Sequence, residues 1–165
     1  MNRRTALSML PAAAAAQSTI RQRFIGVWKL VRYESTDKKT GEVRQPYGPN
    51  PVGRITYDAA GRMSAQLMRP DRRPVGGSPA NGAAAAIRSA SCDDLREMLS
   101  GFASYFGTFD VDEANRTVIH HVQASLIPSW VGTDLRRSFE FSGNQLILTV
   151  TGDQTVLRLR WQREA

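Results

Sequence analysis

Short runs of alternating apolar and polar residues, separated by turn-forming residues, fill most of the chain after residue 24. Alternation of this kind predicts β-strands, because successive side chains of a strand point to opposite faces of a sheet. We expect strands at about 25–35, 54–57, 62–68, 106–111, 117–125, 134–142, 145–151 and 154–163, with a short strand interrupted by the prolines of 46–51. Short turns and the lack of alternating helices indicate an antiparallel meander. We therefore predict an all-β antiparallel barrel of eight to ten strands, since closure removes exposed edges.

One segment departs from the alternation and predicts a single α-helix on the wall or mouth of the barrel. Ser91 is suited to cap this helix, and Asp93 and Asp94 favour its positive N-terminal end. Apolar residues then recur at helical spacing, at Leu95, Met98, Leu99, Phe102, Ala103 and Phe106. The preceding residues, 74–90, are rich in Gly, Ala, Ser and Pro, which is typical of a loop or lid.

Residues 1–16 differ in composition from the rest of the chain. A short basic start is followed by a mildly apolar stretch, and the alanines at 12–16 offer a signal-cleavage site. This order predicts an export signal, and the pair Arg3 and Arg4 makes it similar to a twin-arginine signal. The alternative is a disordered, alanine-rich tail. On the first interpretation the mature barrel domain is 17–165 and is periplasmic or exported.

Composition excludes several other classes of protein. A chain of 165 residues with 41% hydrophobic and 22% charged residues is typical of one globular domain. The formal net charge of +7 is spread along the chain without interleaved aromatic residues, so we expect a solvated basic surface and no nucleic-acid partner. No apolar run is long enough to span a membrane. Cys92 is the only cysteine, so no intramolecular disulfide can form. Oligomeric state is left open.

A glycine two residues before a tryptophan marks the start of the first predicted strand. Gly26 allows a close backbone approach there, and Trp28 and Leu30 fall on the same face of the strand. An indole buries a large area but needs a partner for its N–H, so it suits the closed end of a small barrel. We assign structural roles to Gly26 and Trp28.

The string Gly26-Val27-Trp28-Lys29-Leu30 resembles the first strand of the lipocalin and fatty-acid-binding-protein superfamily. Together with the strings at 47–53, 63–72, 105–109 and 120–133, it is similar to bacterial and fungal lipocalin-like domain proteins over about residues 24–163. The resemblance implies a barrel with an internal cavity for an apolar or amphipathic small molecule, and it implies no catalytic set.

The resemblance also implies a cationic partner for the strand-start tryptophan. In that superfamily an arginine from the far end of the chain often packs across this indole. The last predicted strand offers Arg158, Arg160 and Arg163 around Trp161. We assign this structural role to Arg160.

His120 and His121 are the only histidines in the chain. Neighbouring residues of a strand point to opposite faces, so one of the two faces the cavity and the other faces out. The sequence leaves open which one, although His120 shares the more apolar face. Opposite directions make a shared metal ion improbable, and no other cluster has ligand spacing. We therefore expect no metal and no cofactor, and include both histidines among the candidate ligand-binding residues.

Four further residues are candidates for contact with a ligand. Gln66 lies on a predicted strand, and Arg69 ends it at a rim, where it is suited to clamp Asp71 or to meet a ligand carboxylate. Tyr47, between prolines, is rigidly presented over the mouth. Trp130 lies in a connecting segment, where it either packs on the barrel or covers a ligand.

Three functions are compatible with these residues. We favour a non-enzymatic carrier or sensor of a small hydrophobic or amphipathic molecule. The alternative is a small barrel enzyme, an isomerase, cyclase or dehydratase, that uses the cavity-facing histidine as a general acid or base. A third possibility is a structural or interaction domain whose cavity is filled by its own side chains. An ionisable group facing an open cavity would favour the enzyme, and a uniformly apolar pocket the carrier.

Overall fold

The computed structural model of the protein describes residues 20–74, 80 and 82–164. The predicted export signal, residues 1–16, lies outside the described residues. Within them, no helix is long and apolar enough to cross a membrane.

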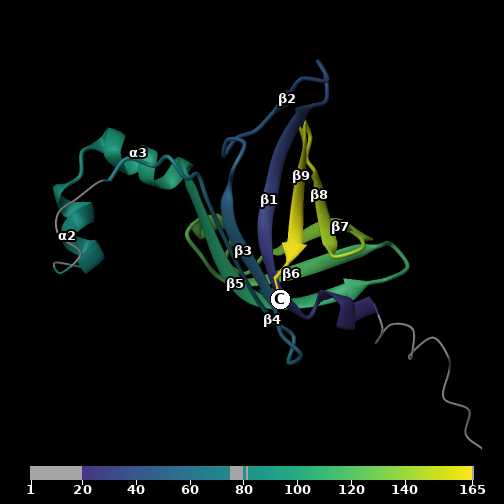
Figure 1. Cartoon of the computed structure of the whole chain (residues 1–165). Helices are drawn as coiled ribbons and strands as arrows, with labels where there is room; N and C mark the ends of the chain where they lie inside the picture. The colour runs from purple at the N-terminus through teal and green to yellow at the C-terminus, as the bar shows by residue number, and fades with distance from the viewer. Residues whose placement is uncertain (1–19, 75–79, 81, 165) are drawn as a thin grey trace, which may run out of the picture.

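The fold is an antiparallel β-barrel (Figure 1). Its strands are β1 (Gly26–Asp37), β2 (Val43–Arg44), β3 (Val52–Tyr57), β4 (Arg62–Met68), β5 (Phe102–Asp112), β6 (Thr117–Ser125), β7 (Asp134–Ser142), β8 (Gln145–Thr151) and β9 (Thr155–Arg163). The order in the sheet is β2-β1-β3-β4-β5-β6-β7-β8-β9, and an additional pairing of β1 with β9 closes it. The short strand β2 flanks β1 outside this closure. The all-β barrel predicted from the alternation is confirmed, with strand ends shifted by a few residues.

The helix expected after Ser91 begins as predicted and ends earlier. Helix α3 (Cys92–Ser100) starts at a capping box, in which the Ser91 side chain accepts from the backbone N–H of Asp94 and the Asp94 side chain accepts from that of Ser91. It ends at Gly101. The rest of the apolar stripe, from Phe102 onward, belongs to β5, where each residue pairs with one of β4. Pairing between strands outweighs the local helical spacing here.

A second helix lies in the stretch predicted as a loop or lid. Helix α2 (Gly82–Ser89) precedes α3, and neither helix contributes a buried residue. Figure 1 shows both extending to one side, beyond the adjoining ends of β4 and β5. The single helix expected on the wall or mouth is therefore replaced by two helices beside the barrel.

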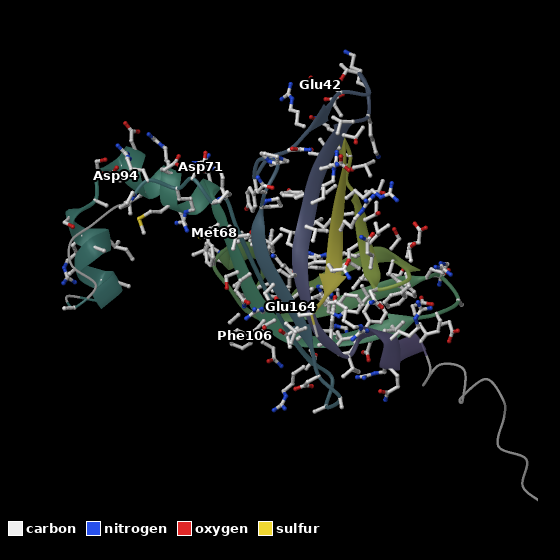
Figure 2. All side chains as sticks on the ribbon, viewed as in Figure 1. Glu42, Met68, Asp71, Asp94, Phe106 and Glu164 are labelled. Carbon is white, nitrogen blue, oxygen red and sulfur yellow. The ribbon has the colours of Figure 1, made fainter. Side chains whose placement is uncertain are left out.

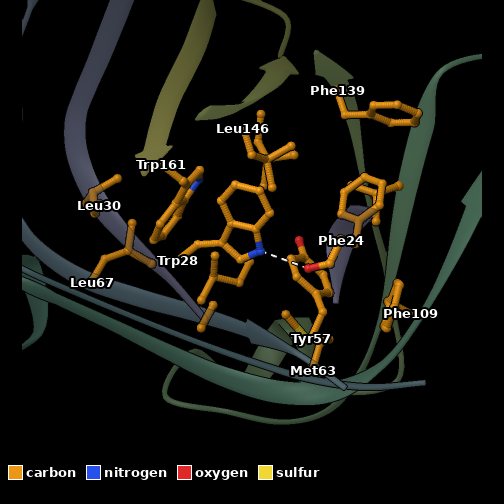
Figure 3. Packing of buried hydrophobic residues seen from close by; sticks show 14 of the residues in the cluster. Phe24, Trp28, Leu30, Tyr57, Met63, Leu67, Phe109, Phe139, Leu146 and Trp161 are labelled. Atoms are coloured by element: carbon orange, nitrogen blue, oxygen red, sulfur yellow. Dashed lines mark hydrogen bonds between the residues drawn. The ribbon is translucent and has the colours of Figure 1, made fainter. Parts of the chain in front are cut away.

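One end of the barrel is closed by aromatic packing around Trp28 (Figure 3). Trp28 is 1% exposed, and its Nε1–H donates to the carbonyl oxygen of Phe24 at 2.8 Å. The Phe24 ring in turn packs edge-on against Tyr57, Phe139 and Phe141, with ring centroids 5.0–5.3 Å apart. The residues just before β1 thus fold back over the interior and fill it.

An arginine of the last strand covers the same indole, and it is Arg163. Its guanidinium carbon lies 4.1 Å from the Trp28 ring centroid, and its Nη1–H donates to the Ile25 carbonyl oxygen at 2.7 Å. Gly26 has a φ of +137°, and a Cβ there would lie 2.5 Å from the Arg163 Nη1. The assignment to Arg160 was wrong, because Trp161 points inward and its neighbour Arg160 therefore points outward.

Replacing Trp28 with alanine should lower the free energy of unfolding by about 3–5 kcal/mol, the range for truncating a large buried aromatic side chain. Urea titration of the variant beside the wild type measures the loss. Phe106→Ala is the matched control, since Phe106 is 53% exposed on the outside of β5 (Figure 2) and its truncation should cost far less. A loss below about 1 kcal/mol for Trp28→Ala would contradict a closing role for Trp28.

Candidate functional site

An internal cavity of about 200 Å³ lies inside the barrel. Aliphatic side chains from β3, β4, β8 and β9 form one part of its lining: Ile55, Leu67, Leu148, Val150, Leu157 and Leu159. Aromatic side chains form the other part: Tyr33, Tyr47, Tyr105, Trp130 and Trp161. A mostly apolar lining with a few polar groups is the usual composition of a small-molecule site.

Two of the candidate residues from the sequence, Tyr47 and Trp130, line this cavity. Tyr47, in the loop between β2 and β3, packs edge-on against Tyr33 of β1 with ring centroids 5.2 Å apart. Trp130, in the 3-10 helix η2 (Pro128–Trp130), packs edge-on against Tyr105 at 5.8 Å. Both aromatic side chains therefore reach the cavity from connecting segments, outside the barrel strands.

His120 is the inward-facing histidine and is fully buried. Its Nε2 is hydrogen-bonded to the hydroxyl of Tyr57 at 2.8 Å, and its Nδ1 to the hydroxyl of Tyr105 at 3.0 Å. Burial lowers the pKa of His120 well below its ordinary value, and the nearby charges of Arg137 and His121 lower it further. The His120 ring is therefore neutral. In a neutral imidazole one nitrogen donates and the other accepts, so one tyrosine hydroxyl donates to the ring and the other accepts from it.

This buried network reaches the cavity through Tyr105. Tyr105 lines the cavity, whereas His120 and Tyr57 are not part of the lining. Burial raises the pKa of both tyrosines, which keeps their hydroxyls protonated. A phenol hydroxyl donates one hydrogen bond and also accepts, and the bond to His120 uses only one of these capacities. The Tyr105 hydroxyl therefore keeps hydrogen-bonding capacity for a molecule in the cavity.

Two polar groups of the lining were not among the candidates from the sequence. The indole nitrogen of Trp161 is buried and has no hydrogen-bond partner among the described residues. Arg137 lines the same cavity from β7. A signal for Arg137 was present, because it alternates in step with Leu135, Phe139 and Phe141 and so shares their inward face.

His121 lies on the outer face of β6, away from the cavity. Its Nδ1 is 2.6 Å from Asp134 Oδ1 of β7, and its Nε2 is 3.1 Å from Asp110 Oδ2 of β5. The hydrogen bond with Asp134, with further support from Asp110, raises the pKa of His121. The prediction that the two histidines face opposite ways is correct, and His121 belongs to a cross-strand ion cluster on the surface.

Gln66 also lies outside the barrel. It alternates in step with Ser64 and Met68 on the outward face of β4, where Figure 2 shows Met68. It also lines a surface groove of about 770 Å³ over β1, β3, β4 and β5. Charged groups, Lys29 and Arg54 among them, border this groove. Gln66 is therefore separated from the internal cavity by the barrel wall.

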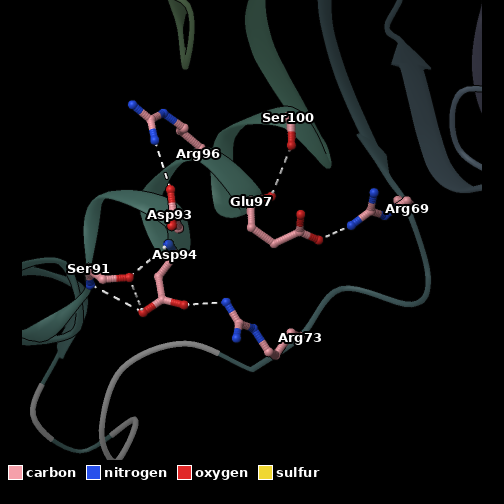
Figure 4. Close-up of polar contacts among 8 residues, drawn as sticks. All are labelled: Arg69, Arg73, Ser91, Asp93, Asp94, Arg96, Glu97 and Ser100. Carbon is pink, nitrogen blue, oxygen red and sulfur yellow. Dashed lines mark hydrogen bonds and ion pairs between the residues drawn. The ribbon is translucent and has the colours of Figure 1, made fainter.

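Arg69, which follows β4, holds helix α3 to the end of that strand (Figure 4). It forms ion pairs with Asp71, at 3.0 Å, and with Glu97 of α3. A second pair joins Arg73 to Asp94 at 2.5 Å. Of the two roles left open by the sequence, the structure shows the clamp, and Arg69 does not line the cavity.

No group of three or more His, Cys, Asp or Glu side chains suited to a metal ion occurs in residues 20–74, 80 and 82–164. The cluster of His121, Asp110 and Asp134 is explained by its own hydrogen bonds.

Comparison with known proteins identifies the family. A family model described as a lipocalin-like domain matches residues 25–163, which confirms the resemblance predicted from the sequence strings. The 4′-hydroxy-3′-methoxypropiophenone carrier protein of Aspergillus oryzae is 31% identical over 93 residues, which cover 53% of this chain and 78% of that protein.

Two solved structures resemble the chain more distantly. Fatty-acid-binding protein 1 of Echinococcus granulosus has a TM-score of 0.40 at 13% identity, and the match covers 87% of this chain and 99% of that one. A mutant of the fluorescent protein UnaG has a TM-score of 0.39 at 12% identity, covering 86% and 96% of the two chains.

His121 should make stability depend on pH in a defined direction. The folded protein raises the pKa of His121, so the protonated ring stabilises the fold. This contribution to the free energy of unfolding is complete below the unfolded pKa of about 6.5, and it is lost as the pH rises through the folded pKa. Urea titrations of wild type and His121→Gln should therefore differ more at about pH 5.5 than at about pH 8.5. His120 is present in both proteins and cancels in the comparison. A difference that grows with pH would contradict the ion cluster.

Proposed function

The chain belongs to the lipocalin-like domain family, and from this premise we propose that it is a carrier that binds a small amphipathic molecule inside its barrel. The observation that carries the proposal is the internal cavity, with its apolar and aromatic lining and its few convergent polar groups. A volume of about 200 Å³ lies below the ~300–1,000 Å³ typical of sites for drug-sized ligands. The ligand is accordingly small, of the size of a substituted single ring.

The unpartnered N–H of Trp161 indicates what this ligand must offer. A buried donor without a partner costs free energy, typically about 1–3 kcal/mol. Trp161 is 1% exposed and lines the cavity, so a ligand with an acceptor oxygen would supply the missing partner. An aromatic ketone has both a ring for the apolar lining and such an oxygen. The ligand named for the Aspergillus relative is of this class.

The arrangement of His120 supports a carrier over the enzyme alternative. Both ring nitrogens are already engaged by tyrosine hydroxyls, and Tyr105 lies between the imidazole and the cavity. A general acid or base must come within hydrogen-bond reach of the reacting group. The aromatic contacts of Tyr47 and Trp130 likewise fit side chains that cover a bound molecule.

We also propose that residues 1–16 direct export. The basic start and the alanines before the mature domain support this proposal. Intact-mass measurement of protein from its native host should show cleavage near Ala16. Replacing Arg3 and Arg4 with lysine should block export if the route is twin-arginine. Retention of residues 1–16 in the native host would overturn the proposal.

The carrier function is tested with 4′-hydroxy-3′-methoxypropiophenone and a ring-matched hydrocarbon that lacks its oxygens. Isothermal titration calorimetry should show binding of the ketone. Trp161→Phe removes the indole N–H and should weaken ketone binding by a few-fold to about tenfold, the equivalent of about 0.5–1.5 kcal/mol for one hydrogen bond. The hydrocarbon should be affected less, because it never used that N–H.

Trp130→Phe is the matched control, since it alters another cavity-lining indole and leaves the Trp161 N–H in place. It should reduce the affinities for ketone and hydrocarbon alike. If neither compound binds the wild type up to its solubility limit, the carrier proposal fails for this ligand class. Equal losses for both compounds in Trp161→Phe would contradict the hydrogen bond and leave only a packing role for Trp161.

A further inference from the structure

Arg137 places a positive charge on the inner face of the barrel. It is half-buried on β7, in step with the inward-facing Leu135 and Phe139, and it lines the internal cavity. Its neighbour Arg136 is exposed on the outer face of the same strand. An inward-facing arginine in a cavity that is otherwise aliphatic and aromatic requires an explanation, because burying a charge without a partner is costly.

No carboxylate of the described residues lies within ion-pair distance of Arg137. Within the described residues its Nη1–H donates to the carbonyl oxygen of Leu135 at 3.1 Å, and this bond uses one of five guanidinium donors. On the outer surface, by contrast, Arg158 pairs with Glu140 at 3.7 Å and Arg136 approaches Asp134 at 3.8 Å. Arg137, which lines the cavity, has no ion-pair partner among the described residues.

The groups that surround Arg137 do not compensate its charge. Its guanidinium carbon lies 5.7 Å from the centroid of the Tyr105 ring. The tyrosines of the buried network, Tyr57 and Tyr105, stay protonated, and His120 between them is neutral. A cation–π contact of this length gives a modest attraction and no neutralisation.

We propose that the ligand of this cavity is an acid, and that Arg137 binds its carboxylate with the Tyr105 hydroxyl as a second donor. In this arrangement the Nδ1–H of His120 donates to the Tyr105 hydroxyl, and the Tyr57 hydroxyl donates to Nε2, so the Tyr105 proton is free for the carboxylate. The inference rests on the proposed carrier function and specifies the charge of the ligand. A guanidinium pairs with a carboxylate through two parallel N–H···O bonds, which are stronger than bonds between neutral groups. Leu148, Leu157 and Leu159 then contact the apolar part of the acid. The cavity volume selects small monocarboxylic acids with one ring or a short chain.

The test compares cinnamate with cinnamamide, which have the same number of heavy atoms and differ in charge. By isothermal titration calorimetry, wild type should bind cinnamate at least about tenfold more tightly, the equivalent of ~1.4 kcal/mol. Arg137→Gln should remove this preference by weakening cinnamate binding, with little change for cinnamamide. Arg137→Lys keeps the positive charge but cannot form the two parallel N–H···O bonds of a guanidinium, so its preference for cinnamate over cinnamamide should lie between those of wild type and Arg137→Gln. Arg136→Gln removes a charge from the outer face of the same strand and should leave the preference intact.

Thermal unfolding without ligand gives a second, independent measurement. If Arg137 serves the ligand, Arg137→Gln should melt at or above the wild-type temperature, because a half-buried unpaired charge has been removed. A lower melting temperature would indicate a structural role and overturn the proposal. Equal affinity of wild type for cinnamate and cinnamamide would also overturn it, while leaving the carrier function in place. Failure of both compounds to bind, together with failure of the aromatic ketone, would instead reject the carrier function itself.

Discussion

Closure of one end of the barrel around Trp28 is the constraint on which the rest of the interior depends. The indole N–H is satisfied by Phe24, the ring is covered by Arg163, and the glycine at position 26 makes room for that guanidinium. These contacts join the first described segment of the chain to the end of its last strand, so the barrel is closed and plugged by the same residues. The buried aromatic cluster fills one end of the interior, and the remaining interior, lined by aliphatic side chains and by other aromatic side chains, is the cavity.

The polar groups of the interior divide into those that the fold satisfies and those that it does not. His120 is held by two tyrosine hydroxyls and is neutral, and the Trp28 N–H has a carbonyl partner. Trp161 and Arg137 line the cavity, the first without a hydrogen-bond partner and the second without an ion-pair partner in the described chain. Buried polar groups are normally paired. The two unpaired groups both line the cavity, so we infer that a molecule bound there supplies their partners.

Most of the strands could be predicted from the sequence, since alternation with period two is a local property. The main error came at Phe102 and Phe106, where apolar spacing fits both a helix and a strand, and where pairing with β4 decided for the strand. The family could also be recognised from local strings. Of the candidate ligand-binding residues, those in connecting segments, Tyr47 and Trp130, line the cavity, whereas Gln66 and Arg69 do not, because neither the inner face of β4 nor the position of α3 is encoded locally.

What the sequence by itself determined is the set of alternating faces. It established that His120 and His121 oppose each other and that Trp28 and Leu30 share a side, because a strand has only two faces. Tertiary structure alone decided which face is the interior, since that depends on how the eight strands β1 and β3–β9 close on one another. It also decided that Arg163 covers Trp28 and that Arg137, Tyr105 and Trp161 meet at one cavity. Those residues are far apart in the chain, and only barrel closure brings them within reach of one small molecule.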